Sequence, residues 1–115
     1  MEYNRYNLKG NVAAKRDILK NLADLFEGNE YKSKLISNNM KEFATTISGL
    51  INKYNIRHNN LDSKNKNIIL ESMTKTELEK LYDNIYDLLL TAFMYANTLD
   101  LRKELDEKYL KSLSN

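Results

Sequence analysis

The 115-residue chain contains no cysteine, no proline and no tryptophan, only one histidine and only three glycines. The absence of cysteine excludes a disulfide framework, a thiolate metal site and a cysteine nucleophile. One histidine excludes motifs that need two, such as H-E-x-x-H, and three separated glycines leave no Gly-rich phosphate loop. We therefore predict a protein that is not an enzyme, with no catalytic residues, no cofactor and no metal ion.

Long apolar segments are also missing. The longest, residues 88–96, is interrupted by Thr91 and is too short to span a membrane. The polar residues 1–5 lack the apolar segment of a secretory signal peptide. The net charge is +2, and 42% hydrophobic with 30% charged residues is typical of a globular domain rather than a disordered chain. We expect a cytoplasmic protein with no membrane contact.

The fold class follows from what remains. Proline is absent, runs of β-branched residues are rare, and apolar residues recur at steps of three and four, which is typical of amphipathic helices. The length fits one domain. We predict an all-α fold in which residues 1–10 form an N-terminal arm and residues 11–115 form a single-domain antiparallel bundle of four to five helices.

The first two helices have recognisable ends. Asn11 is suited to cap the first helix, and Gly28 to follow its last residue with a positive φ. Asn29 is then expected to cap a second, longer helix that continues to about Tyr54. Gly49 lies inside this second helix and predicts a close crossing with another helix, because glycine is otherwise unfavourable there.

The last helix is the longest. A short helix is expected at about 63–72, and two overlapping capping boxes, Thr74 with Glu77 and Thr76 with Glu79, then each predict a new start near residue 75. The sequence leaves open whether this helix continues through residues 97–100 or stops and restarts with Asp100 as a cap. Its predicted core positions are Leu78, Leu81, Tyr82, Ile85, Leu88, Leu89, Ala92 and Ala96.

This last helix is amphipathic at its start and apolar on nearly every side further on. Its acidic side, with Glu79, Asp83 and Asp87, is expected to be solvated, because carboxylate metal sites in bundles need Glu-x-x-His partners. Leu90 and Met94 then occupy that same side. They are either buried by the first helix or the arm, or they form a protein interface in which a polar residue sets the register. The predicted interface residues are Tyr86, Leu90, Met94, Asn97, Leu101 and Leu105.

A second candidate surface is basic. Residues 1–60 carry ten Lys and Arg against six Asp and Glu, and the segment 53–66 mixes cations with aromatic and Asn residues. Such a mixture can contact phosphates and stack on bases, although dedicated nucleic-acid domains have a stronger basic stripe, and a solvated surface is the alternative. Its residues are Arg5, Lys9, Lys53, Tyr54, Arg57, His58, Lys64 and Lys66.

Together these patterns predict a small non-enzymatic helical protein that acts by binding another protein, with a homodimer as one form of that binding. An inhibitor encoded by a phage or mobile element, or an immunity-type protein, fits a compact bundle that has no catalytic motif. The alternative is a nucleic-acid-binding or nucleoprotein-associated bundle that uses the arm and the segment 53–66. His58, next to Arg57, is expected to be exposed rather than catalytic.

Overall fold

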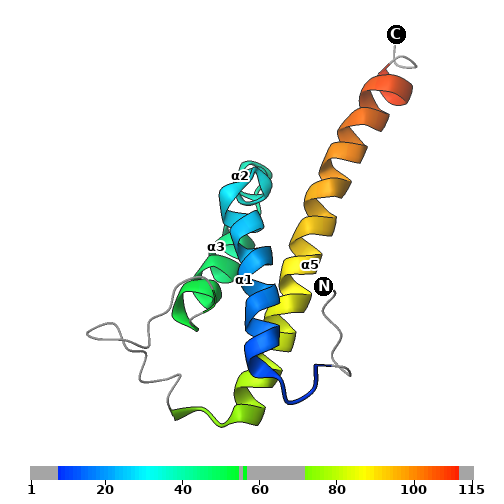
Figure 1. Ribbon diagram of the computed structural model, residues 1–115. Helices are drawn as coiled ribbons and strands as arrows, with labels where there is room; N and C mark the ends of the chain where they lie inside the picture. Colours follow the sequence, from blue (N-terminus) through cyan, green and yellow to red (C-terminus); the bar gives the residue numbers. More distant parts are fainter. Residues whose placement is uncertain (1–7, 55, 57–71, 112–115) are drawn as a thin grey trace.

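The computed structural model describes residues 8–54, 56 and 72–111 of the chain (Figure 1). This part contains four α-helices and no strand, which confirms the all-α prediction for the described residues. Residues 1–7 of the predicted arm and 63–71 of the predicted short helix lie outside them. The helices are α1 (Val12–Gly28), α2 (Tyr31–Ser37), α3 (Lys41–Lys53) and α5 (Lys75–Leu105), and the π-helical segment η2 (Asp106–Leu110) continues α5.

Helix α1 begins as predicted and ends differently. The side chain of Asn11 accepts a hydrogen bond from the amide of Ala14 at 3.0 Å, which confirms it as the N-cap. The prediction of a left-handed Gly28 is wrong, since this glycine is the last helical residue and has no positive φ. Asn29 caps the helix instead, because its side-chain amide donates to the carbonyl oxygen of Leu25 at 3.1 Å.

The predicted long second helix is in fact two helices. α2 and α3 are separated at residues 38–40, where Asn39 adopts a left-handed conformation with φ 68°. Asparagine tolerates this conformation better than other residues with a side chain. The amide of Met40 donates to the carbonyl of Leu35 and closes the turn. Gly49 marks no helix crossing, because a Cβ built on it meets no atom within 4 Å.

The last helix starts where the capping box predicts and does not break. The hydroxyl of Thr74 accepts from the amide of Glu77 at 3.1 Å. α5 then runs through residues 97–100 without interruption, so Asp100 is not a cap. Since the helix has 31 residues, it is about 46 Å long. In contrast, α1 has 17 residues and is about 25 Å long.

The core lies between α5 and the three shorter helices. α5 contributes most of its predicted core positions, with Leu78, Leu81 and Leu88 only partly buried. The fully buried hydrophobic residues are Leu19, Ala23, Phe26, Leu35, Ala44, Ile47, Ile51, Ile56, Tyr82, Ile85, Leu89, Ala92 and Ala96. Burial raises the pKa of Tyr82, whose hydroxyl therefore stays protonated and donates to the carbonyl of Tyr54 at 3.2 Å.

The structure does not confirm the predicted antiparallel bundle of four to five helices. α1 and α5 pack most extensively on each other and run in the same direction, since Lys15 contacts Asp83 and Phe26 contacts Phe93 (Figure 1). α3 returns the chain to the end where α5 starts, as the bond from Tyr82 to Tyr54 shows. No helix in the described part of the chain is long and apolar enough to cross a membrane.

The turn between α2 and α3 yields the first prediction. Replacing Asn39 by alanine is expected to lower the free energy of unfolding by about 1 kcal/mol, because alanine has a higher energy in the left-handed conformation. Asn39→Gly is expected to be at least as stable as the natural chain, because glycine has no such penalty. Urea unfolding followed by circular dichroism measures both changes. Equal stability of the alanine and glycine variants would contradict a left-handed conformation at residue 39.

Candidate protein interface on helix α5

A buried ion cluster joins the start of α1 to the start of α5. Lys15 has no exposed surface, and its Nζ lies 2.8 Å from Oδ1 of Asp83 and 3.5 Å from Oε1 of Glu79. The other carboxylate oxygen of Glu79 accepts from the amide of Gly10 at 2.7 Å. The prediction of a solvated acidic side is therefore wrong for Glu79 and Asp83, whose side chains are only 18% and 20% exposed.

The ion cluster fixes α1 near the start of α5 and leaves the far end of α5 without a covering helix in the described part of the chain. It places the first turn of α1 beside the second and third turns of α5, and the two helices then run in the same direction although α5 is almost twice as long. Ala96 is the last fully buried residue of α5, and from Asn97 to Lys111 only Leu99 and Asp106 are half-buried while the others are exposed. In Figure 1 the orange and red part of α5 extends well beyond α2.

Four aliphatic residues of α5 are exposed along one side of the helix. The exposed fractions are 37% for Leu90, 70% for Met94, 54% for Leu101 and 45% for Leu105. We call these four residues the α5 stripe. At about 100° per residue they fall within a sector of roughly 60°, on the side of the helix opposite Ile85, Leu89, Ala92 and Ala96. The alternative of burial by α1 is therefore wrong for the stripe, while residues 1–7 of the arm, the other element expected to bury it, lie outside the described residues.

The remaining predicted interface residues flank the stripe. Asn97 is exposed between Met94 and Leu101, and Tyr86 is half-buried one turn before Leu90. Two further aromatic residues, Tyr95 and Tyr109, are exposed on the same helix and its π-helical continuation, and sequence reasoning had not assigned them to the interface. Exposed apolar side chains that share one side of a helix are a candidate binding surface.

The helix beneath the stripe is continuous, and two threonine hydroxyls along it bond back to its own carbonyl groups. The hydroxyl of Thr91 donates to the carbonyl of Asp87, and that of Thr98 donates to the carbonyl of Met94, each at 2.8 Å. Further along, Nζ of Lys108 lies 2.8 Å from Oε1 of Glu104. The stripe is thus displayed on a preformed helix, and a partner need not pay for ordering this segment.

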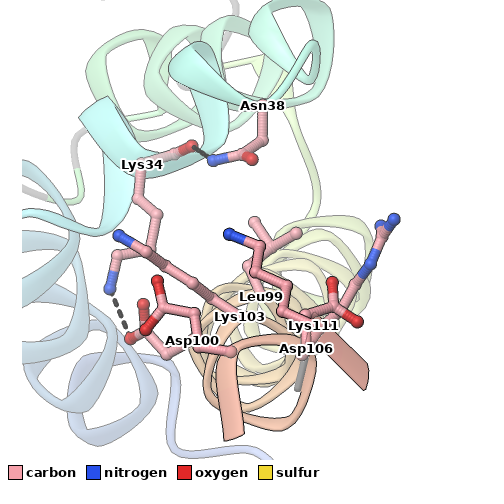
Figure 2. A pocket seen from close by; sticks show the side chains of 9 residues that line it. Lys34, Asn38, Leu99, Asp100, Lys103, Asp106 and Lys111 are labelled. Atoms are coloured by element: carbon pink, nitrogen blue, oxygen red, sulfur yellow. Dashed lines mark hydrogen bonds and ion pairs between the residues drawn. The ribbon is translucent and has the colours of Figure 1, made fainter. Parts of the chain in front are cut away.

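A groove lies between α2 and the far part of α5 (Figure 2). Its volume is about 540 Å³. In Figure 2, Lys34 reaches across to Asp100, with 2.6 Å between Nζ and Oδ2, and this hydrogen bond raises the pKa of Lys34. Charges of both signs line the groove and largely compensate one another, so it has no strong preference for an anion or a cation. Its lining residues are Lys34, Asn38, Leu99, Asp100, Arg102, Lys103, Asp106, Glu107 and Lys111.

The predicted basic surface is described only in part. Lys9 is exposed in the turn before α1, while Lys53 and Tyr54 lie at the end of α3. Nζ of Lys53 lies 5.7 Å from the centroid of the Tyr54 ring, which is half-buried and thus not displayed for stacking on a base. The remaining members of the predicted surface lie outside the described residues: Arg5, Arg57, His58, Lys64 and Lys66.

Metal chemistry finds no support in the described part of the chain, where no three His, Asp or Glu side chains are grouped to hold an ion. Comparison with protein-family models, with curated proteins and with solved structures finds no match to this chain. The surfaces described above are therefore the observations on which a function can be proposed.

The buried ion cluster yields the second prediction. Lys15→Ala is expected to lower the free energy of unfolding by about 2 kcal/mol, because it leaves Asp83 and Glu79 without their buried cation. The matched control is Lys20→Ala on the same helix, whose ion pair with Asp24 is exposed and contributes less than about 0.5 kcal/mol. Denaturant unfolding measures both variants. Similar losses for the two lysines would contradict the role of Lys15.

Proposed function

We propose that this chain is a helical protein-interaction module that binds its partner through the α5 stripe. The observation that carries the proposal is the exposure of Leu90, Met94, Leu101 and Leu105 on the side of α5 that faces away from the core. A row of exposed aliphatic side chains on one side of a helix is typical of a protein-binding surface. Coverage by a second protein removes them from water.

The free energy available from this coverage is substantial. Complete burial of a Leu or Met side chain contributes about 1.5–3 kcal/mol, and the four stripe residues together contribute several kcal/mol even though they are partly buried already. The preformed helix avoids the cost of folding on binding. Recognition of an amphipathic helix through anchors about one turn apart is a common mode of protein association.

The spacing of the stripe supports a helical partner. Leu90 and Leu101 are separated by eleven residues, and so are Met94 and Leu105. Eleven residues in three turns correspond to about 3.67 residues per turn, close to the period of a straight α-helix, so the four side chains stay on one side along their whole length. A second straight helix can therefore contact all four.

Two further functions, an inhibitor or immunity-type role and nucleic-acid binding, remain predictions. An inhibitor or immunity-type role, in which the chain covers a functional surface of its partner, stays a prediction that follows from a binding surface without catalytic groups. Nucleic-acid binding stays the alternative, but the half-buried ring of Tyr54 and its contact with Lys53 do not favour it. We therefore place the function on α5.

The third prediction concerns the stripe itself. Met94→Glu and Leu101→Glu are each expected to abolish stripe-dependent protein binding and to leave the helical circular dichroism signal unchanged, because both side chains are exposed in the folded chain. Leu25→Glu is the matched control, since Leu25 is a 39% exposed leucine on α1 outside the stripe. The measurement is retention of cellular proteins on the immobilised chain, natural and substituted.

The ionic strength distinguishes this function from the alternative. Binding through Leu and Met side chains is expected to change little as salt rises, whereas binding to phosphates weakens steeply. Binding that survives both glutamate substitutions, or that salt abolishes, would contradict the proposed role of the stripe.

A further inference from the structure

We infer that the partner of the α5 stripe is α5 of a second copy of this chain, in an antiparallel pair with the two-fold axis between Asn97 and Thr98. This inference rests on the proposed function, because it names the protein that covers the stripe. It follows from a symmetry of the exposed residues about the midpoint of the stripe.

The stripe is symmetric in its spacing. Counted outward from the point between Asn97 and Thr98, Met94 lies as far on one side as Leu101 lies on the other, and Leu90 as far as Leu105. A two-fold interface requires one surface to be complementary to itself, so that residue i contacts residue j and j contacts i. An antiparallel pair therefore places Met94 against Leu101 and Leu90 against Leu105, each twice.

The same symmetry continues into charged residues at both ends of the stripe. In the sequence, Asp87 and Lys108 are equally many residues from the midpoint, and so are Tyr86 and Tyr109, with Lys108 and Tyr109 in the π-helical segment η2. An antiparallel pair brings Asp87 of one copy near Lys108 of the other, at both ends. Lys108 is already bound to Glu104 within its own chain and can extend this ion pair to the second carboxylate.

Charge also decides against the parallel arrangement. In a parallel pair in register each residue faces its own copy, so Asp87 would face Asp87 and Lys108 would face Lys108. Opposed like charges destabilise such an interface, whereas the antiparallel order matches opposite charges. The antiparallel order also aligns the two helix dipoles favourably.

The shape of the protein allows this pairing. α5 extends beyond α2 (Figure 1), so an antiparallel pair places the exposed far part of α5 from one copy along residues 84–94 of the other. The remaining helices of the two copies then lie at opposite ends of the pair. At the axis, Asn97 lies beside the second copy, where an amide pair sets the register as a polar residue does in coiled coils.

Introduced cysteines test the arrangement sharply, because the natural chain has none. On mild oxidation, Thr98→Cys is expected to form a disulfide-linked dimer by itself. Leu90→Cys is expected to form none by itself, because the two copies of residue 90 lie about 22 Å apart along the pair, and a disulfide needs Cα atoms within about 7 Å. Mixing Leu90→Cys chains with Leu105→Cys chains is expected to link the two.

Two controls accompany the oxidation. Ile36→Cys places a thiol at a 39% exposed position on α2 and is expected to form no disulfide-linked dimer. Sedimentation equilibrium of the natural chain is expected to show the mass of two copies at high concentration, and Met94→Glu is expected to abolish this dimer. The charge-reversed single variant Asp87→Lys is expected to weaken the dimer, and the double variant with Lys108→Asp to restore it.

The outcomes separate this inference from the proposed function. A chain that stays monomeric at every concentration and forms no link at Thr98→Cys overturns the dimer. If glutamate in the stripe still abolishes capture of another protein, the proposed function stands without the dimer. If no stripe-dependent binding is found at all, both fail. A disulfide formed by Leu90→Cys alone overturns the antiparallel order.

Discussion

The ion pairs from Lys15 of α1 to Glu79 and Asp83 of α5 set how far the two helices are displaced along each other. A lysine without exposed surface is stable only when its charge is compensated, so the register that brings these groups together is strongly favoured. The contacts of Phe93 with Phe26 and Tyr31 occur in the same register, two to three turns further along α5. Electrostatics and aromatic packing thus specify one alignment.

The exposed end of α5 is a consequence of this alignment. Since both helices start at the same end of the molecule and α5 is the longer, its last turns extend beyond the residues that bury it. The ion pair between Lys34 and Asp100 joins this part of α5 to α2. The leucines and the methionine on its far side are then displayed to solvent on a preformed helix, which is the basis of the proposed binding function.

The sequence predicts part of this picture well. The apolar period identifies the all-α fold, and side-chain oxygens at Asn11 and Thr74 identify the starts of α1 and α5. Prediction from the sequence fails where tertiary contacts decide between two local structures that the sequence pattern allows equally. Nothing in the spacing shows that Asn39 interrupts one long helix, or that Lys15 buries its charge against Asp83 on a helix 68 residues away. The exposure of the stripe likewise depends on the alignment of two helices, which periodicity does not contain.

Side-chain methyl NMR spectra recorded at increasing protein concentration would show whether a second copy of α5 covers the α5 stripe. The methyl signals of Leu90, Met94, Leu101 and Leu105 are expected to shift together as the dimer forms, while that of Leu25 on α1 stays in place. Stripe signals that do not change with concentration, or changes confined to other residues, would contradict this pairing.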